Sequence, residues 1–400
     1  MFSAADQQWM ERALALARQG LRSATPNPRV GCVLISAAGA LVGEGWHQRA
    51  GEAHAEVHAL RAAGQDARGS TAYVTLEPCA HFGRTPPCSN ALIDAGVARV
   101  LVAMEDPNPL VAGRGLDRLR EAGIEVRCGL LEDEARELNL GFVSRMTRGL
   151  PWVRLKVAAS LDGRTALPDG RSQWITGAAA RADGHAWRAR ACAILTGIGT
   201  VRDDDPQLTV RDLPESDGAQ IGQPTGQPTG QPIRQPMRVL IDSRLEVDPG
   251  AKLVRAGGLL LAHALDEHWL ATGPLAEKAR LLKDHGVELW SSPTLSSSSS
   301  SLSTPSSPGK VDLGALLAEL ARRGVNELHV EAGAGLNGSL VREARVDELL
   351  VYLTPALLGD SRAMFNLEPP DALESAKRLY FHEMVKVGND LRILARFKPV

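Results

Sequence analysis

The chain has 400 residues, of which 44% are hydrophobic and 23% are charged. A chain of this length and composition can bury a large core and is expected to form two domains, which excludes a disordered chain and a small peptide scaffold. Its 45 Lys and Arg against 47 Asp and Glu give a net charge of -2. That balance supplies no general attraction to nucleic acid or to an acidic membrane surface.

The cysteine content and the N-terminal sequence bear on the cellular compartment in which the protein is expected. Five cysteines are too few, and odd in number, for a disulfide framework, so a reducing environment is favoured. Residues 1–20 mix acidic and polar residues with an amphipathic apolar pattern, unlike a secretory leader. No segment approaches the roughly 18 consecutive apolar residues of a membrane span. We therefore expect a soluble cytoplasmic protein.

In the first half of the chain, helical and strand patterns alternate. The patterns predict helices at 4–19, 53–63, 88–95 and 114–122, and strands at 30–35, 72–76 and 99–103. Helices interleaved with short apolar strands indicate a three-layer α/β domain. One further helix is predicted over 132–146, and the run Gly-Leu-Pro at 149–151 breaks the pattern. The boundary is therefore placed near residue 148, which gives domains 1–148 and 149–400.

The second half repeats an α/β pattern. It predicts strands at 152–157, 193–196, 237–241, 258–262, 286–290, 327–331, 348–354 and 391–397, and helices at 178–190, 312–323 and 336–344. Two low-complexity inserts interrupt this domain, a Gly-Gln-Pro-Thr repeat near 214–236 and a serine-rich run near 291–309. Neither can bury enough apolar surface to offset the entropy of ordering, so both are predicted to be solvated loops.

A candidate metal site lies in the first half. His54 opens a predicted helix, and Cys79 and Cys88 follow later in the chain. One imidazole and two thiolates leave a fourth tetrahedral position open, as is typical of catalytic zinc. Glu56 is then placed to move protons to and from a water that the metal activates. The order H-x-E, P-C and a further cysteine is the signature of zinc deaminases, although their commonest form spaces the cysteines by two.

Other interpretations of these residues are weaker. His54 and His58 have the spacing of a helical metalloprotease site, but Ala55 stands where that motif needs glutamate. Taken one at a time, the histidine would be a surface residue and the cysteines buried small hydrophobes. Taken together, their order favours the metal site. The remaining thiols are interpreted as core or surface cysteines: Cys32, Cys128 and Cys192.

A second candidate site lies in the second half. Residues 331–339 satisfy G-x-G-x-x-G between a predicted strand and a predicted helix, where backbone amides can approach a phosphate. A tight turn without a ligand would also select glycine. The motif lies late in its domain, and the strand ending at 352–355 offers no acidic residue to hold a ribose. A nucleotide-binding fold other than the Rossmann fold is therefore favoured.

Motifs in both halves resemble the bifunctional deaminase/reductase family of riboflavin biosynthesis, the RibD family. The similar runs are T-P-N-P-R-V-G at 25–31, H-A-E at 54–56, E-P-C-A-H-F-G-R-T-P-P-C at 77–88, K-V-A-A-S-L-D-G-R at 156–164, S-Q-W-I-T at 172–176, G-T-V-R-D-D-D-P-Q-L-T-V-R at 199–211, I-D-S at 241–243 and the loop 331–339. The resemblance implies an α/β chain with a cytidine-deaminase-like N-terminal domain and a dihydrofolate-reductase-like C-terminal domain. Ala80 departs from the family, which often has serine there, but it is not a ligand position.

The resemblance also implies site residues. In the deaminase half they are the zinc ligands His54, Cys79 and Cys88, the proton carrier Glu56, and Asn27 at the pyrimidine edge. The implied NADPH contacts are Ala158, Trp174, Thr200, Asp204, Ser243, Gly333, Ala334, Gly335, Leu336, Asn337, Gly338 and Ser339. The implied substrate contacts are Ser172, Arg188, Leu208, Arg211 and Glu331. Guanidinium forks suit a phosphate, and a carboxylate suits sugar hydroxyls. Lys156 and Asp162 are further candidates for orientation or proton transfer.

The expected function is a two-step conversion. Zinc-dependent hydrolytic deamination of 2,5-diamino-6-(5-phosphoribosylamino)pyrimidin-4(3H)-one is followed by NADPH-dependent reduction of its ribosyl group, giving 5-amino-6-(5-phosphoribitylamino)uracil. We expect a homo-oligomer. One alternative is a zinc nucleoside or tRNA deaminase with a non-catalytic C-terminal domain, although no basic stripe interleaved with aromatic residues is evident. Another is a structural zinc-binding and nucleotide-sensing module, which a fourth protein ligand on the metal would support.

Overall fold

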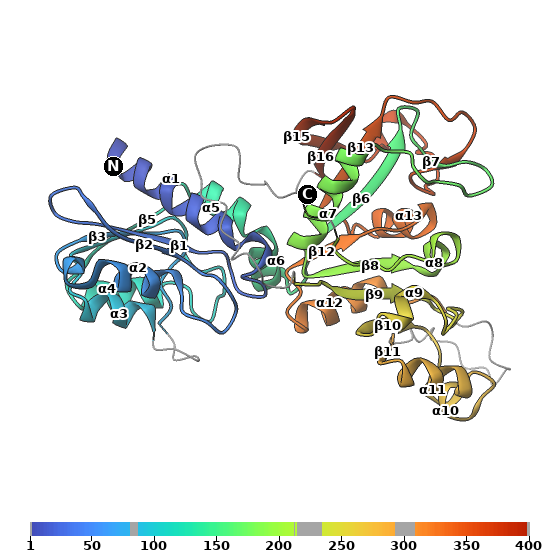
Figure 1. Ribbon diagram of the computed structural model, residues 1–400, viewed down its shortest axis with the longest axis horizontal. Helices are drawn as coiled ribbons and strands as arrows, with labels where there is room; N and C mark the ends of the chain where they lie inside the picture. The colour runs from blue at the N-terminus through green and yellow to red at the C-terminus, as the bar shows by residue number, and fades with distance from the viewer. Residues whose placement is uncertain (1, 81–86, 212, 214–233, 293–308, 398–400) are drawn as a thin grey trace. The chain divides into compact units, whose positions relative to one another are not determined.

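The computed structural model describes residues 2–80, 87–211, 213, 234–292 and 309–397 (Figure 1). The chain divides into two compact units, Met1–Leu150 and Pro151–Val400, and each is described by itself. The two predicted solvated loops lie almost entirely outside the described residues. Within the described part of the chain, no helix is both long and apolar enough to cross a membrane.

The first unit is a five-stranded sheet between two layers of helices. The strand order is β2-β1-β3-β4-β5, with β1 antiparallel to both neighbours and β3, β4 and β5 parallel. The strands are β1 Gly31–Ile35, β2 Leu41–Trp46, β3 Thr71–Val74, β4 Arg99–Val102 and β5 Glu125–Cys128. The helices are α1 Ala4–Arg18, α2 Ala55–Ala63, α3 Cys88–Asp94, α4 Arg114–Glu121, α5 Glu132–Leu138 and α6 Leu140–Arg148, with short 3-10 turns at Gln19–Arg22 and Gly64–Ala67.

The layers follow from the apolar pattern of the strands. Helices α1 and α5 lie over one face of the sheet, and α2, α3 and α4 lie over the other (Figure 1). Every residue of β1 is buried, as expected for a central strand that is covered on both faces. The predicted three-layer α/β architecture is confirmed for this unit.

The predicted helix over 132–146 is wrong, because the structure has two helices separated at Asn139. The side chain of Asn139 is buried, accepts a hydrogen bond from the backbone N–H of Arg29 (2.8 Å) and donates one to its carbonyl (3.0 Å). These bonds fix the backbone of Asn139 at φ -116° and ψ 22°, outside helical geometry. The sequence pattern also missed β2, which carries two glycines, and β5, whose residues are mostly exposed.

The second unit contains a nine-stranded sheet with the order β11-β10-β9-β8-β12-β6-β13-β16-β15. Neighbouring strands are parallel from β11 to β13 and antiparallel from β13 to β15. The strands are β6 Trp152–Ser160, β8 Ala193–Gly197, β9 Met237–Ile241, β10 Leu259–His263, β11 Val287–Ser291, β12 Glu327–Val330, β13 Glu348–Thr354, β15 Leu379–Val387 and β16 Asp390–Phe397. β7 Arg164–Ala166 and β14 Arg362–Ala363 form a separate pair.

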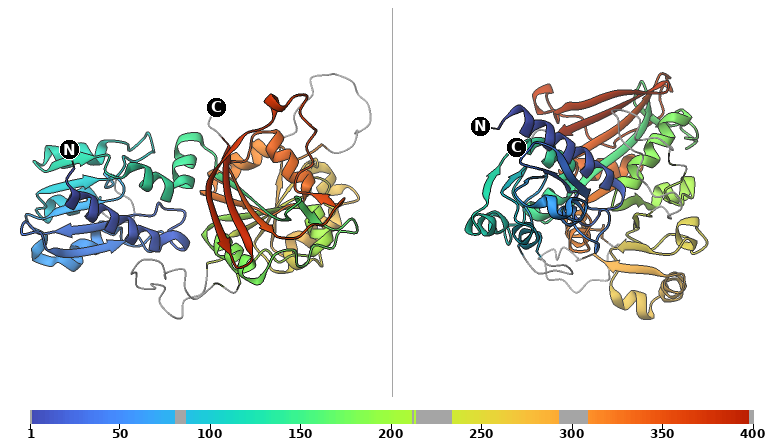
Figure 2. Two further views of the ribbon diagram at one scale, coloured as in Figure 1. Left: turned by 90° about the horizontal axis from the view of Figure 1, so that it is seen from above. Right: turned by 60° about the vertical axis from the view of Figure 1, so that its left-hand side comes forward.

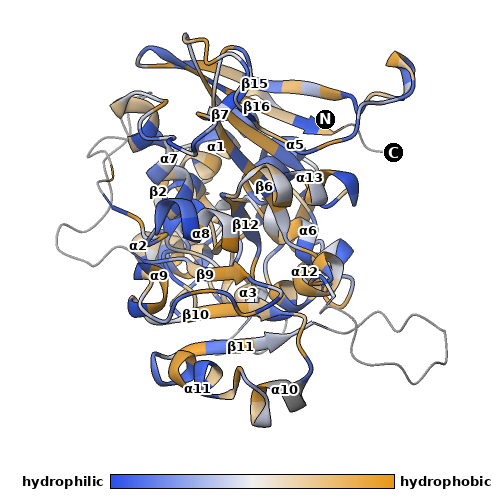
Figure 3. Cartoon of the chain, turned by 90° about the vertical axis from the view of Figure 1, so that its right-hand side faces the viewer, coloured by the Kyte–Doolittle hydropathy of each residue, from blue (hydrophilic) through white to orange (hydrophobic). Residues whose placement is uncertain are grey.

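The helices of this unit pack against the sheet. They are α7 Ala178–Arg190, α8 Ile198–Asp204, α9 Lys252–Arg255, α10 Glu267–Thr272, α11 Ala276–Asp284, α12 Leu313–Arg322 and α13 Ala334–Arg342, with a 3-10 turn at Leu373–Ser375. Hydrophobic residues are concentrated in inner strands such as β9 and β10 (Figure 3). Apolar side chains of these two strands form a buried cluster with Leu253 and Leu282.

Several elements of the second unit were not predicted. They include α8, α11 and the long edge strand β15, which forms a hairpin with β16 along one side of the unit (Figure 2). β15 has no buried residue, so it lacks the alternating pattern that marks a strand with one buried face. Each predicted strand and helix of the second half has a counterpart in the structure, with ends shifted by a few residues.

Candidate active sites

The first site gathers the three predicted metal ligands of the first unit. His54 caps the N-terminal end of α2, Cys79 follows β3, and Cys88 is the first residue of α3. Their ligand atoms all lie within 4.8 Å of one another. His54 Nδ1 is 3.2 Å from Cys88 Sγ and 3.7 Å from Cys79 Sγ. Ligands of a tetrahedral zinc stand about 3.6 Å apart for Zn–S near 2.3 Å and Zn–N near 2.0 Å, so this donor set fits zinc.

The cluster is completed by a buried acid. Glu56 lies on the first turn of α2, is 3% exposed, and its Oε2 has no hydrogen-bond partner among the described residues. Burial, and then the nearby charge of Cys79, raise the pKa of Glu56 to about 7. A carboxyl group that titrates near neutral pH can both accept and deliver a proton. This is the property required of the predicted proton carrier.

The thiols are arranged to hold a cation. A hydrogen bond with Cys88 is the largest influence on Cys79 and, together with His54, lowers the pKa of that thiol despite its burial. The backbone N–H of Cys88 also donates to Cys79 Sγ at 3.3 Å. These contacts favour a thiolate at Cys79, the form that binds metal, while the hydrogen bond with Cys79 and burial raise the pKa of Cys88.

A buried carboxylate that the sequence did not single out holds this loop. Glu77, two residues before Cys79, is 5% exposed. It accepts backbone N–H bonds from Asp106 (3.0 Å), Gly113 (3.0 Å) and Gly115 (2.7 Å). It thereby ties the start of α4 to the cysteine loop. The only available signal was an acidic residue at the end of an apolar strand.

Asn27 lies beside a second residue that the sequence did not identify, His47. Asn27 Nδ2 is 3.0 Å from His47 Nε2, and His47 Nδ1 is 3.2 Å from the carbonyl oxygen of Ala53. Because a carbonyl only accepts, we assign the ring proton to Nδ1, and Nε2 then accepts from the amide of Asn27. This hydrogen bond fixes which end of the Asn27 side-chain amide is the donor, so its side-chain oxygen is the acceptor end. The rings of His47 and His54 meet edge to face at 5.2 Å, which places Asn27 close to the metal ligands.

The second histidine considered in the sequence analysis, His58, and the three remaining cysteines do not belong to this cluster. His58 lies one turn further along α2 and does not belong to the metal-ligand group of the described residues. Cys32 and Cys192 are buried and Cys128 is exposed, and none of the three belongs to the metal-ligand group of the described residues.

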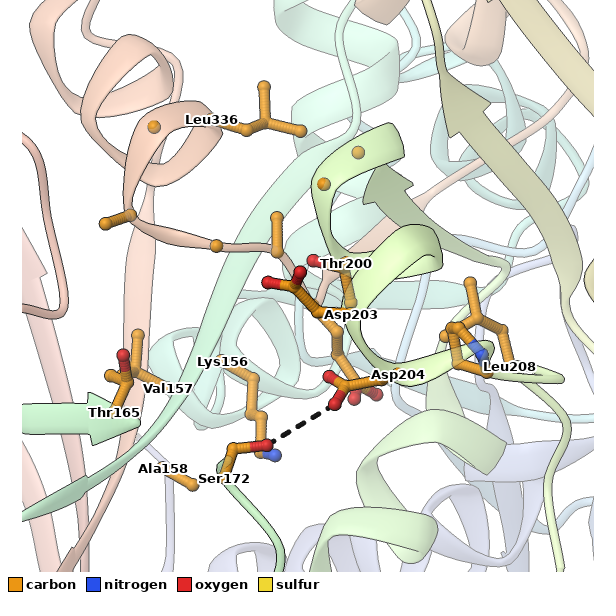
Figure 4. Close-up of a pocket in the computed structure, with 18 of the residues that line it drawn as sticks. Lys156, Val157, Ala158, Thr165, Ser172, Thr200, Asp203, Asp204, Leu208 and Leu336 are labelled. Atoms are coloured by element: carbon orange, nitrogen blue, oxygen red, sulfur yellow. Dashed lines mark hydrogen bonds between the residues drawn. The ribbon is translucent and has the colours of Figure 1, made fainter. Parts of the chain in front are cut away.

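The second site is a large cavity within the second unit. Its volume is about 1420 Å³, above the roughly 300 to 1,000 Å³ of a pocket for one drug-sized ligand. It has room for a dinucleotide and a second molecule. Figure 4 shows Lys156 extending from β6 toward Ser172 and Asp204, with Thr200 and Leu336 further along the wall.

Most of the predicted NADPH contacts line this cavity. They are Ala158, Trp174, Thr200, Asp204, Ser243, Gly333, Ala334, Gly335, Leu336 and Ser339. The glycine-rich loop ends as the N-terminal turn of α13, with Gly333 as its cap, so backbone N–H groups face the space. Gly333 has only one atom, Thr200 Oγ1 at 4.0 Å, near the position of a Cβ, which leaves room for close approach of a phosphate. This open cradle fits the cofactor.

Two of the predicted NADPH contacts do not reach the cavity. Asn337 is buried and donates to the carbonyl of Met364 at 3.1 Å. A Cβ at Gly338 would lie 2.1 Å from the carbonyl oxygen of Asn366, so this glycine serves close packing. Both residues lie on the side of α13 that packs on residues 364–366, and neither lines the cavity.

All of the predicted substrate contacts line the cavity: Ser172, Arg188, Leu208, Arg211 and Glu331. The guanidinium of Arg188 grips Glu331, with Nε 2.5 Å from Oε1 and Nη2 2.8 Å from Oε2. Its Nη1 donates to the carbonyl of Thr209 at 3.1 Å. Burial opposes ionisation of Glu331, but the charge and hydrogen bonds of Arg188 outweigh it and hold the pKa well below the usual range. The two predicted substrate contacts therefore form one ionised pair.

Lys156 and Asp162 differ in their surroundings. Burial lowers the pKa of Lys156, which lines the cavity near Glu331 and Arg188. Asp162 instead accepts from Ser160 Oγ (2.5 Å) and from the backbone N–H of Gly359 (2.8 Å), and it does not line the cavity. Asp162 therefore anchors a turn.

The two halves of the chain match two family models. Residues 3–104 match the cytidine and deoxycytidylate deaminase zinc-binding region, and residues 151–393 match the RibD C-terminal domain. The chain is 47% identical over 389 residues to the riboflavin biosynthesis protein RibD of Escherichia coli, covering 96% of this chain and 98% of that protein. It is 43% identical over 401 residues to RibD of Haemophilus influenzae, covering 98% and 97%. The solved structure of Acinetobacter baumannii RibD, form 1, has a TM-score of 0.83 and 41% identity over 99% of both chains.

A His-Cys-Cys cluster beside a buried glutamate in one unit, and a dinucleotide-sized cavity in the other, define a zinc deaminase joined to a reductase. The similarity over nearly the whole chain makes the assignment specific: this chain belongs to the RibD family of riboflavin biosynthesis proteins. It is a bifunctional deaminase and reductase that uses zinc and NADPH. The predicted function is confirmed, and the alternative with a non-catalytic C-terminal domain is not supported.

Proposed function

We propose that the chain deaminates 2,5-diamino-6-(5-phosphoribosylamino)pyrimidin-4(3H)-one in its first unit and reduces the ribosyl group of the product in its second. The result would be 5-amino-6-(5-phosphoribitylamino)uracil. A solved relative from Thermotoga maritima, 29% identical, is named as a diaminohydroxyphosphoribosylaminopyrimidine deaminase and 5-amino-6-(5-phosphoribosylamino)uracil reductase. The observation that carries the proposal is the convergence of three ligand atoms within 4.8 Å beside buried Glu56.

In the deaminase step, His54, Cys79 and Cys88 hold the metal and Asn27 holds the pyrimidine edge. When bound, zinc supplies a Lewis acid that lowers the pKa of water at the open fourth position. Glu56 would take a proton from the attacking water and deliver a proton to the exocyclic nitrogen, which leaves as ammonia. The water oxygen becomes the new C=O oxygen and the second water proton moves to the adjacent ring nitrogen, so one water is consumed for each ammonia released.

In the reductase step, the second unit orients two molecules. NADPH would be held by Ala158, Trp174, Thr200, Asp204, Ser243 and residues 333–336 and 339, and when bound it would supply hydride to C1 of the sugar. Ser172, Leu208 and Arg211 hold the substrate together with the Arg188–Glu331 pair. Two N–H groups of Arg188 are not used on Glu331 or Thr209 and are available to a phosphate oxygen.

The location and assembly of the enzyme belong to the same proposal. We place it in the cytoplasm, because free thiols at the metal site suit a reducing compartment. Its partner is the small phosphoribosyl substrate rather than nucleic acid or membrane, and we expect a homo-oligomer.

The test is a pair of activities measured on the same full-length protein. Cys79→Ser removes one thiolate, so ammonia release should fall by about 100-fold or more while reduction of supplied deaminated intermediate stays within about twofold. Glu56→Gln should show the same split but keep its zinc content. Ammonia release and NADPH oxidation are followed separately, with metal content as the third measurement.

Two outcomes would contradict the proposal. If Cys79→Ser released ammonia at the wild-type rate, the metal cluster would have no part in the deamination. Loss of both activities in a folded variant would contradict separate sites. Arg171→Ala, on an exposed residue, is the control and should leave both activities unchanged.

A further inference from the structure

His329 is a completely buried imidazole at the centre of the second unit. It lies on β12 with 0% exposure, between β8 and β6. In the sheet register it stands opposite Arg154 of β6, which in turn stands opposite Glu348 of β13. Along its own strand it shares a face with Glu327, since alternate residues of a strand point the same way. This face is the one that α7 covers, because Arg190 of α7 binds Glu327 at 2.8 Å.

The imidazole touches the carboxylate that lines the substrate cavity. His329 Nε2 lies 3.3 Å from Glu331 Oε1. The same oxygen receives the Nε–H of Arg188, which also grips Oε2. Glu331 is therefore held by Arg188 on one side and approached by His329 from within the sheet. The cavity borders Arg188 and Glu331 but not His329.

The surroundings keep this histidine neutral. Burial lowers the pKa of His329, and the guanidiniums of Arg154 and Arg188 act in the same direction, against the opposing charge of Glu331. A neutral imidazole carries one N–H. Of the two ring nitrogens, Nε2 is the one that contacts Glu331 Oε1, at 3.3 Å.

Packing alone does not account for an imidazole here. Neither ring nitrogen has a partner with full hydrogen-bond geometry among the described residues. A buried polar group in that condition costs about 1–3 kcal/mol, whereas an apolar side chain of similar size would fill the space without that penalty. The contact with Glu331 is the polar interaction that an apolar side chain would lose.

We propose that His329 is a positioning residue of the reductase, which fixes the orientation of the Glu331 carboxylate toward the sugar hydroxyls of the substrate. The inference rests on the proposed role of Glu331 in binding that substrate. His329 itself stays behind the carboxylate and touches neither substrate nor cofactor. Its removal should therefore affect binding of the sugar phosphate and leave binding of NADPH unchanged.

The experiment compares His329→Leu, which removes the N–H, with His329→Gln, which retains an N–H donor. In His329→Leu we expect KM for the deaminated substrate to rise about tenfold, because the polar contact that orients the Glu331 carboxylate is lost, while KM for NADPH stays within about twofold. His329→Gln should bring KM for the substrate back to within about threefold of wild type. The thermal transition of the second unit, measured by calorimetry, reports whether each variant is folded.

Leu328→Val is the matched control, because Leu328 is equally buried on the same strand and faces the other side of the sheet. A purely structural role would give His329→Leu and Leu328→Val similar kinetics, or would change thermal stability with wild-type KM, and either result overturns the inference. Failure of His329→Gln to recover KM while His329→Leu is impaired would overturn it as well.

Glu331→Gln separates this inference from the function on which it rests. If Glu331→Gln leaves KM for the sugar phosphate unchanged, the proposed role of Glu331 fails. If Glu331→Gln raises KM and His329→Leu does not, only the role of His329 fails. In the double variant, the effect of His329→Leu should largely disappear, because its partner oxygen has been altered.

Discussion

Arg154 is among the largest side chains that the protein buries completely, and its charge is neutralised within the sheet. It donates to Glu348 (2.5 Å) and Glu327 (2.9 Å), and its guanidinium lies 4.4 Å from the ring centre of Trp187. Glu348 is also bound by Arg396 at 2.8 Å. Buried charges of this kind are tolerated only while every partner is present.

Arg154→Ala should destabilise the second unit by about 3–5 kcal/mol, because two carboxylates lose a buried partner. Chemical denaturation followed by circular dichroism measures the change. Arg171→Ala is the matched control: its pair with Asp169 is exposed, so its effect should stay within about 0.5 kcal/mol. Equal effects of the two substitutions would contradict the proposed importance of the buried network.

The same network makes a pH prediction. Burial opposes ionisation of Glu348, but Arg154 and Arg396 lower its pKa below the ordinary value of 4.5. Its contribution to stability is therefore complete above that value and is lost as pH falls through the lower folded pKa. The stability difference between wild type and Arg154→Ala should narrow below about pH 4.5, and a difference that widens on acidification would contradict this assignment.

Single residues were predicted from sequence where a motif orders them along the chain. His54, Glu56, Cys79 and Cys88 belong to such a motif, and the structure brings them together. Contacts between residues that are far apart in the sequence leave no such motif. The grip of Arg188 on Glu331 joins residues 143 positions apart, so sequence could name both as substrate contacts but could not show that they bind each other.

At the scale of elements, the first turn of α4 packs directly on the cysteine loop. A Cβ at Gly115 would lie 1.9 Å from the carbonyl oxygen of Pro78, the residue before Cys79. The backbone N–H of Gly115 also binds Glu77. Helix and cysteine loop can approach this closely only because the second residue of the helix is a glycine.

Gly115→Ala should force α4 and the cysteine loop apart. We expect a loss of about 1–3 kcal/mol in stability from overpacking, together with weaker zinc binding and reduced ammonia release. Zinc competition with a chromophoric chelator measures the affinity. Arg118→Ala, exposed on the same helix, should leave zinc affinity unchanged, and wild-type zinc affinity in Gly115→Ala would count against the contact.

Helices and strands were predicted well where the spacing of apolar residues along the sequence matches the buried face of the element. The helix predicted over 312–323 matches α12, in which buried Leu313, Leu316, Leu317 and Leu320 repeat at the period of a helix. The pattern fails at Asn139, where one side chain bound to Arg29 divides a continuous helical run. It also fails at β15, which buries neither face and so carries no periodic signal.

At the scale of the whole molecule, the metal and the dinucleotide cavity belong to different compact units. A ligand that binds only the folded form stabilises the unit that holds it. Zinc should therefore stabilise residues 1–150 and leave residues 151–400 unaffected.

Removal of zinc with a chelator should abolish ammonia release and lower the unfolding temperature of the first unit by several degrees. Reduction of supplied intermediate should continue, and NADPH should raise only the other transition. Differential scanning calorimetry with and without each ligand measures both. Restoring zinc is the control and should recover both ammonia release and the original transition. If removal of zinc lowered the unfolding temperatures of both units equally, zinc would not stabilise the first unit alone, and this prediction would be wrong.

Glu77 has one more consequence for this enzyme. Its carboxylate already holds the backbone of residues 106–115 beside the cysteine loop through contacts that need no ion. Glu77 therefore supports the cysteine loop through bonds that involve none of the three metal-ligand side chains, so replacing Glu77 should weaken metal binding while all three ligands are still present.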